Sequence, residues 1–248
     1  MKRGFDMTHT VLITGGTKGI GKACTDSFLA KGYNVVATYR SDDDAADAMR
    51  TSHSGKSLEV IKCNAADFEQ TKACWQLVTE RFGGADIIIN NAGISQQKLF
   101  CDISRTEWDE MFDVNIGSAF NTVKCAYDHL VSCKWGRIIN VSSIWGIAGA
   151  SCEVHYSASK AALIGFTKAL AKELGPSHIT VNCVAPGVID TAMNSHLGAD
   201  DIAALCEETP LCRTGSPDEV ASLICYLASD DAAFITGQVI SPNGGIVI

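Results

Sequence analysis

Short apolar runs alternate with longer amphipathic runs from one end of the chain to the other. The short runs are continuous in hydrophobicity, as in "ADIIIN" (85–90), which is typical of strands buried on both faces. We expect strands over residues 10–16, 33–39, 58–63, 85–90, 136–143, 179–186 and 237–242. We expect helices between them, including 19–31, 67–82, 105–132, 155–174 and 217–229. This alternation predicts an α/β fold, a doubly wound parallel sheet of about seven strands with helices on both faces.

Length and composition agree with a single compact domain. The chain has 248 residues, of which 46% are hydrophobic and 19% are charged, so it can bury a large core. We assign residues 1–9 to an N-terminal extension, of which 1–6 have no pattern of their own, and 10–248 to the domain. The net charge of −8 gives no sign of the basic surface that a nucleic acid requires, so we expect no nucleic-acid partner.

The eleven cysteines do not have the pattern of a disulfide framework or a metal site. Their number is odd, no C-x-x-C pair occurs, and Cys183 and Cys225 lie in apolar runs where a free thiol packs as a small hydrophobe. No apolar run approaches the ~18 residues of a membrane span, and the start "MKRGFDMTHT" lacks the apolar stretch of a signal peptide. We therefore expect a cytoplasmic protein with no metal and no membrane partner.

The stretch "TGGTKGIG" follows the first expected strand and opens the first expected helix. Gly15 permits a tight turn, and Gly19 and Gly21 let a ligand and the helix approach the backbone. Backbone N–H groups and the positive end of the helix then converge on an anion, which predicts a dinucleotide pyrophosphate site of the Rossmann type. A glycine cluster alone is often only a turn, so the prediction depends on its place after the strand.

The end of the second expected strand favours NADP over NAD. An acidic residue there would bind the 2′-hydroxyl of NAD, but the chain reads "VVATYRS" and its first carboxylate is Asp42. Arg40 and Lys18 instead suit a 2′-phosphate, which Arg40 can grip by a two-point contact. The alternative is that both are ordinary surface charges.

Tyr156 and Lys160 are four positions apart in the expected helix 155–174, so their side chains share one face. A free tyrosine keeps its proton up to a pKa of about 10, and a neighbouring ammonium lowers that pKa. The pair therefore suits proton exchange with a substrate. The plain alternative is a core tyrosine beside a lysine that reaches for water.

Six motifs occur in the order and register of one enzyme family. They are "TGGTKGIG", "NNAG" (90–93), "DVNIG" with Asn115, "NVSS" with Ser143, "YSASK" (156–160) and "APGVIDT" (185–191). With these motifs the chain, from Thr10 to its C-terminus, resembles the short-chain dehydrogenase/reductase family. The resemblance implies that residues 10–248 form a short-chain-type Rossmann domain. Within that family it is most similar to the 3-oxoacyl-(acyl-carrier-protein) reductases and the related acetoacetyl-CoA reductases.

The resemblance implies a catalytic set of Asn115, Ser143, Tyr156 and Lys160. Tyr156 would donate a proton to the substrate oxygen, Ser143 would hydrogen-bond that oxygen, and Lys160 would stabilise the phenolate. We expect the attraction of the lysine charge to outweigh burial, which raises a tyrosine pKa. Asn115 would anchor a water that links Lys160 to solvent. Taken singly, Ser143 also fits a turn or helix cap, and Asn115 fits a satisfied amide inside helix 105–132.

The resemblance also implies NADP(H) as the cofactor. Its expected contacts are Gly15, Thr17, Lys18, Gly19, Ile20, Gly21, Arg40, Asn64, Ala65, Asn91, Ala92, Gly93, Tyr156, Lys160, Pro186, Gly187, Ile189 and Thr191. Asn90 would brace the sheet instead of touching the cofactor. At the position of Asn64 many relatives have an acidic residue that accepts a hydrogen bond from the adenine amine. Asparagine also offers an acceptor oxygen, so we expect a weaker contact with adenine.

Other expectations concern the substrate. Residues 193–217 lie where the family keeps a mobile lid. Trp145 would wall the pocket or pack in the following loop, and His155 would lie at the pocket edge. For an acidic carrier protein, the candidate basic contacts near the mouth are Lys134, Arg137, Lys168 and Lys172.

Three functions fit these patterns. The first is NADPH-dependent reduction of a 3-oxoacyl thioester, with the acyl group carried on acyl carrier protein or on coenzyme A. The second keeps the chemistry for another ketone or secondary alcohol, such as a sterol or a sugar alcohol. The third is a dinucleotide-binding regulator or scaffold without catalysis, against which the intact catalytic set argues. The family also implies a homotetramer, with helices 105–132 and 155–174 at one interface.

Overall fold

A computed structural model describes residues 8–194 and 198–248 of the chain. Its seven strands form one parallel sheet in the order β3-β2-β1-β4-β5-β6-β7. The strands are β1 (Thr10–Ile13), β2 (Asn34–Tyr39), β3 (Leu58–Lys62), β4 (Ile87–Asn90), β5 (Gly136–Val141), β6 (Ile179–Val184) and β7 (Val239–Ile240). Each lies inside one of the seven expected strands, so the predicted fold class is confirmed.

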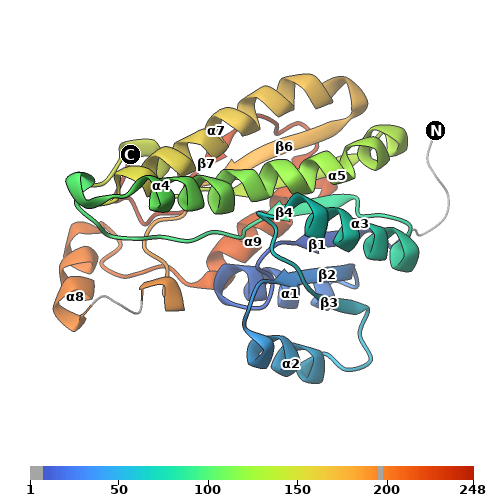
Figure 1. Cartoon of the computed structure of the whole chain (residues 1–248), viewed down its shortest axis with the longest axis horizontal. Coiled ribbons are helices and arrows are strands. Elements are labelled where there is room, and N and C mark those ends of the chain that lie inside the picture. Colours follow the sequence, from blue (N-terminus) through green and yellow to red (C-terminus); the bar gives the residue numbers. More distant parts are fainter. Residues whose placement is uncertain (1–7, 195–197) are drawn as a thin grey trace.

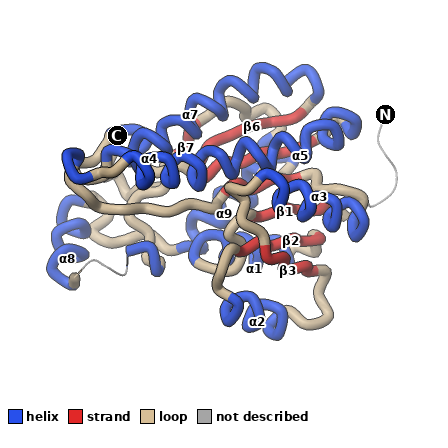
Figure 2. The backbone as a smooth tube through the Cα atoms, in the orientation of Figure 1, coloured by secondary structure: helices blue, strands red, loops and turns tan. Residues whose placement is uncertain are grey.

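Helices lie on both sides of the sheet, as the ribbon in Figure 1 and the tube in Figure 2 show. They are α1 (Gly19–Ala30), α2 (Asp43–Ser52), α3 (Phe68–Phe82), α4 (Arg105–Phe112), α5 (Ser118–Cys133), α6 (Trp145–Ala148), α7 (Val154–Leu174), α8 (Ala199–Glu208) and α9 (Pro217–Leu227). Successive strand residues point to opposite faces. Val11 and Ile13 therefore pack with α1 and α9, while Leu12 packs with α3, α5 and α7.

Four helices begin at a polar residue whose side chain accepts a hydrogen bond from the first turn. These residues are Asp42 for α2, Asp67 for α3, Ser104 for α4 and Ser216 for α9. Such caps satisfy N–H groups that have no partner within the helix. Helix α1 begins differently, with no side-chain cap and no acidic residue in its first turn.

The helix predicted over 105–132 is interrupted in the structure. Helix α4 ends at Phe112, residues Asp113–Gly117 form a π-helical turn, and α5 begins at Ser118. A π turn adds a residue without changing the apolar pattern enough to show in sequence, and such turns are frequent at functional sites. The structure also contains α2, α6 and α8, which lie outside the predicted helix ranges.

Parallel pairing sends the carboxyl ends of β1, β4, β5 and β6 to one edge of the sheet. The loops that follow these strands carry most of the predicted site residues. Residues 1–7 of the expected extension and 195–197 of the expected lid lie outside the described residues. Among the helices that the structure describes, none is long and apolar enough to cross a membrane.

Candidate active site

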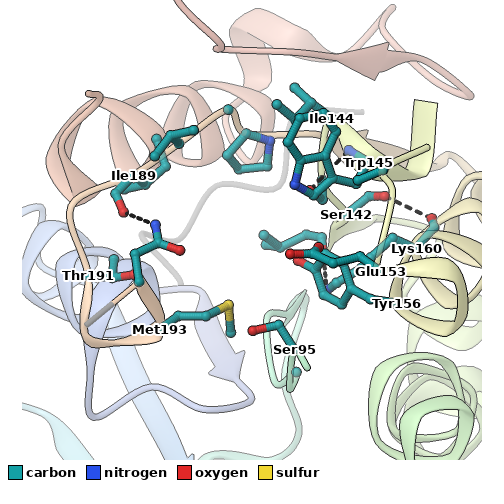
Figure 3. Close-up of a pocket in the computed structure, with 18 of the residues that line it drawn as sticks. Ser95, Ser142, Ile144, Trp145, Glu153, Tyr156, Lys160, Ile189, Thr191 and Met193 are labelled. Carbon is teal, nitrogen blue, oxygen red and sulfur yellow. Dashed lines mark hydrogen bonds between the residues drawn. The ribbon is translucent and has the colours of Figure 1, made fainter. Parts of the chain in front are cut away.

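A cavity of about 250 Å³ opens at the carboxyl edge of the sheet (Figure 3). Tyr156, Lys160 and Trp145 lie on one side of it, and Ile189, Thr191 and Met193 lie on the other. The predicted site residues that line it are Ile20, Asn91, Gly93, Ser143, Tyr156, Lys160, Pro186, Gly187, Ile189 and Thr191. Most of the expected nicotinamide side of the site is therefore brought together in one cavity.

Tyr156 and Lys160 are neighbours on the first turns of α7. The Lys160 Nζ lies 5.7 Å from the centroid of the Tyr156 ring and donates a hydrogen bond to the Val141 carbonyl at 3.0 Å. Both residues are buried, with 7% of Tyr156 and 4% of Lys160 exposed. The lysine does not reach for bulk water, so the plain alternative from the sequence is wrong.

Burial controls the proton affinities of this pair. It raises the pKa of Tyr156 to about 12, although a hydrogen bond from Ser143 acts to lower it and the Glu153 carboxylate raises it further. Burial also lowers the pKa of Lys160 to about 8. We expected the lysine charge to outweigh desolvation at Tyr156, and this expectation is wrong for the chain without a cofactor. At neutral pH the tyrosine holds its proton and the lysine keeps its charge.

Ser143 makes the turn-cap contact that the sequence left as an alternative to its expected role at the substrate oxygen. Its Oγ accepts a hydrogen bond from the Trp145 backbone N–H at 3.2 Å, at the start of α6, so it does act as a turn cap. The same side chain hydrogen-bonds Tyr156 and lines the cavity. The cap holds the hydroxyl in place beside the tyrosine.

Asn115 lies on the π turn and is 1% exposed. Its Oδ1 accepts from the Ile94 N–H at 2.8 Å, and its Nδ2 donates to the Ile94 carbonyl at 3.0 Å and to Ser159 Oγ at 2.9 Å. A Cβ on Gly93 would come within 3.1 Å of both Asn115 Oδ1 and Lys160 Nζ, so the three residues are packed together. The amide is satisfied by protein atoms and lies behind the cavity wall rather than in it.

The glycine loop is shaped as the sequence predicted. Gly15 and Gly19 have positive φ values of 64° and 49°, which favour glycine. A Cβ on Gly21 would lie 2.1 Å from the Gly15 carbonyl oxygen, so only glycine fits there. Above this loop the uncapped first turn of α1 directs N–H groups outward, as an anion site at a helix N-terminus requires.

The "NNAG" segment holds this loop from β4. The backbone N–H groups of Asn91 and Ala92 each donate to Thr14 Oγ1 at 3.0 Å, and Asn91 Nδ2 donates to the carbonyl oxygens of Thr14 and Gly15. Asn90 Nδ2 instead donates to Asn140 Oδ1 at 2.8 Å across β4 and β5, which confirms its bracing role.

The cations expected near the adenosine ribose differ in their surroundings. Lys18 forms an ion pair with Asp42, and Asp42 also accepts from the Ala45 N–H at 2.8 Å as the cap of α2. Arg40 is exposed and forms no ion pair with any residue from 8–194 or 198–248. Arg40 is thus the cation that a ligand can engage without breaking an existing pair.

The predicted contacts Thr17, Asn64 and Ala65 do not line the cavity. Thr17 and Ala65 are buried. The Asn64 Oδ1, expected to face adenine, accepts a hydrogen bond from the Ala66 N–H at 3.3 Å. That oxygen keeps a second lone pair with which to accept from a ligand, because an amide oxygen has two.

One expectation for the substrate side is corrected and another is met. His155 is 0% exposed and its Nε2 lies 3.0 Å from Gln96 Oε1, so it is a buried residue beneath the pocket rather than at its edge. Trp145 does line the cavity. The sequence did not single out Ser95, Gln97, Ser151 or Glu153, which give the cavity a polar side. They occur in loops with no motif of their own.

The proposed basic patch is not at the mouth of the cavity. Arg137 is 2% exposed at the start of β5 and pairs with Asp230 at 3.2 Å, and Lys134 ends α5 at the same, opposite edge of the sheet. Lys168 and Lys172 are exposed on later turns of α7, away from Tyr156. The order of the motifs along the sequence does not show whether these four charged residues lie at the cavity edge of the sheet or at the opposite edge.

Comparisons with known proteins agree on one family. The family described as "Enoyl-(Acyl carrier protein) reductase" matches residues 15–247. The 3-oxoacyl-(acyl-carrier-protein) reductase FabG of Aquifex aeolicus is 38% identical over 238 residues, which cover 95% of this chain and 96% of that protein. The protein of the same name from Vibrio cholerae is 37% identical over 235 residues, 95% and 96% of the two chains. The solved structure of a "Short-chain dehydrogenase/reductase SDR:Glucose/ribitol dehydrogenase" from Brucella melitensis has a TM-score of 0.92 at 35% identity and covers 98% of this chain and 99% of its own.

Replacing Lys160 by Met should stabilise the protein at neutral pH. A lysine whose pKa falls to about 8 on folding destabilises the folded state below that pH, and this penalty is relieved as pH rises from about 8 toward its ordinary 10.5. After loss of the bond to Val141, we expect Lys160→Met to raise the free energy of unfolding by roughly 2 kcal/mol at pH 7, and by roughly 1 kcal/mol less at pH 9. Urea unfolding at both pH values measures this.

The control for that experiment is Lys168→Met, which changes an exposed lysine on the same helix. It should leave the free energy of unfolding within about 0.5 kcal/mol of the original. A less stable Lys160→Met protein at pH 7 would contradict the assignment of a desolvated, charged lysine.

Proposed function

The chain belongs to the short-chain dehydrogenase/reductase family, which makes it an oxidoreductase acting on CH–OH groups, and we propose that it reduces 3-oxoacyl thioesters with NADPH. The observation that carries the proposal is the buried trio of Ser143, Tyr156 and Lys160 at one wall of the cavity. The names of the relatives at 36–38% identity support the 3-oxoacyl substrate.

The residues present fit a nicotinamide dinucleotide. A Cβ at Gly21 would clash with the Gly15 carbonyl, so glycine lets the loop lie close against the start of α1, whose uncapped N–H groups would face the pyrophosphate. Asn91, Gly93, Pro186 and Thr191 would hold the nicotinamide end, and Arg40 the 2′-phosphate. When bound, this cofactor supplies the hydride that reduces the ketone carbon.

The protein supplies the proton. Ser143 and Tyr156 would both hydrogen-bond the ketone oxygen, and Tyr156, protonated at neutral pH because its pKa is about 12, would donate as negative charge develops there. The charge of Lys160, 5.7 Å from the ring, would stabilise the phenolate by about 3 kcal/mol at an effective dielectric of 20. Stabilising the phenolate favours loss of the proton, so this attraction acts against the rise in the Tyr156 pKa that burial causes.

Asn115 would position Lys160 through their shared contact with Gly93. Its hydrogen bonds to the Ile94 backbone hold the loop that carries Gly93 against the π turn, and its bond to Ser159 links that turn to α7. We also propose, from the family position, that it orders the water through which Tyr156 regains a proton.

A second candidate substrate is a sugar alcohol or another polyhydroxylated secondary alcohol. The polar cavity side made by Ser95, Gln97, Ser151 and Glu153 would suit hydroxyl groups better than an acyl chain. The similar protein from Brucella melitensis is named a glucose/ribitol dehydrogenase, which points to the same class of substrate. A purely regulatory dinucleotide-binding role has no observation in its favour.

A substrate panel tests the proposal. Oxidation of NADPH would be followed with acetoacetyl-CoA, a 2-enoyl thioester, a sterol ketone and ketoses, with NADH in parallel. Turnover of acetoacetyl-CoA at a kcat/KM at least tenfold above the other substrates supports the proposed function. No turnover of that thioester, with turnover of a ketose, would replace it by the second candidate.

Replacing Tyr156 by Phe should reduce kcat by at least 10³-fold, because the proton donor is lost. The Kd for NADPH, measured by fluorescence, should change less than threefold since the ring remains. A Tyr156→Phe protein with unchanged turnover would exclude the proton-transfer role.

Replacing Arg40 by Ala should raise the KM for NADPH about tenfold or more and leave that for NADH nearly unchanged, because a charge-assisted contact to phosphate is removed. Lys56→Ala, another exposed cation, serves as the control. An equal effect on both cofactors would show that Arg40 does not read the 2′-phosphate.

For partners, we propose acyl carrier protein or coenzyme A as the carrier, in the cytoplasm, and a homotetramer. The exposed Phe120 on α5, with 52% of its surface open, suits a helix-to-helix interface. A solution mass of four chains is the expected result.

A further inference from the structure

A second cluster of polar side chains lies at the amino edge of the sheet, opposite the cavity. Asp86 comes just before β4, His9 just before β1, and His129 and Cys133 are on the last turns of α5. Figure 1 shows that this end of α5 is far from α8, which borders the cavity. None of these four residues lines the cavity or takes part in the proposed reaction.

The donor atoms of Asp86, His129 and Cys133 all lie within 4.8 Å of one another. His129 Nε2 is 3.4 Å from Asp86 Oδ1 and 3.7 Å from Cys133 Sγ. Ligands around a tetrahedral Zn²⁺ are about 3.3–3.6 Å apart, given Zn–N, Zn–O and Zn–S bonds of about 2.0–2.3 Å. The two distances from His129 Nε2 lie close to this range, and the Asp86 and Cys133 donor atoms are at most 4.8 Å apart.

The spacing of His129 and Cys133 also suits a metal. Residues four apart on a helix project from the same face, so the imidazole and the thiol can bind one ion without any change in backbone. Nitrogen, sulfur and carboxylate oxygen together form a donor set that Zn²⁺ prefers and that Mg²⁺ or Ca²⁺ does not.

Neighbouring residues hold these ligands in place. The second carboxylate oxygen of Asp86 lies 3.2 Å from His9 Nδ1 and accepts from the Thr10 N–H at 3.3 Å, which leaves Oδ1 directed toward His129. His9 is fixed in turn by stacking on Trp135, with ring centroids 4.0 Å apart. A Cβ on Gly84 would lie 2.4 Å from the His129 ring, so the loop before Asp86 passes directly against the imidazole.

We propose that Asp86, His129 and Cys133 bind one Zn²⁺ ion per chain, with a water as the fourth ligand. Binding forms a Zn–S bond as the Cys133 thiol gives its proton to solvent, and the His129 Nε2 binds as the neutral imidazole. The ion would tie the end of α5 to the start of β4. Its role is structural, because the cluster lies at the sheet edge opposite the reacting groups.

The test uses the full chain, treated with chelator and kept reduced by a phosphine. Co²⁺ is titrated first as a spectroscopic probe, followed by Zn²⁺. We expect one equivalent per chain, a tetrahedral cobalt spectrum with a thiolate charge-transfer band, and displacement by Zn²⁺. Zn²⁺ at 100 times its Kd should raise the midpoint of thermal unfolding by about 5–10 °C.

Two variants probe the ligands, and one serves as the control. Cys133→Ser should abolish the charge-transfer band, and both Cys133→Ser and His129→Gln should weaken Zn²⁺ binding at least tenfold. Cys101→Ser, an exposed cysteine outside the cluster, should bind like the original chain. Circular dichroism checks that each variant is folded, and the near-isosteric Cys133→Ser keeps the test valid if His129→Gln is not. Absence of stoichiometric uptake, or equal uptake by Cys133→Ser, overturns the proposal.

Discussion

Parallel pairing of the strands is the constraint on which the rest of the molecule depends. It places the carboxyl ends of β1, β4, β5 and β6 side by side, although the residues that follow them are far apart in sequence. The glycine loop, the Asn91 segment, Ser143 and Pro186 meet only for this reason. The same rule sends the chain back to the amino edge after each helix, so groups there are kept apart from the reaction.

Within the site, low access to water decides the chemistry more than proximity of charges does. Lys160 donates to the Val141 carbonyl and Tyr156 hydrogen-bonds Ser143, while burial costs the charged lysine much of its hydration. A fold tolerates such an unfavourable arrangement when function selects it. The π turn at Asn115 is a second unfavourable arrangement of this kind. It interrupts the regular helix and places the Asn115 amide against the loop at Gly93.

Local patterns predicted the strands, the glycine loop and the spacing of Tyr156 and Lys160, because each depends on a few neighbouring residues. The sign of the pKa shift at Tyr156 was not predictable from them, since it depends on how completely the final fold excludes water. We wrongly expected Arg137 and Lys134 near the mouth of the cavity for a related reason. The edge of the sheet at which a residue lies depends on the direction of its strand, which the whole topology determines. The cluster at Asp86 escaped notice because its members come from three separate segments.

Asp42 makes two contacts, an ion pair with Lys18 and a cap on α2, and these contacts connect the choice of cofactor with the stability of that helix. One carboxylate both neutralises Lys18 and caps the start of α2. Removing this side chain would free the lysine for a phosphate but leave the Ala45 amide without its acceptor. Asparagine or serine at this position would keep the acceptor and discard the charge. A redesign of nucleotide preference in this protein should therefore change the charge at position 42 and keep a side chain there that can cap the helix.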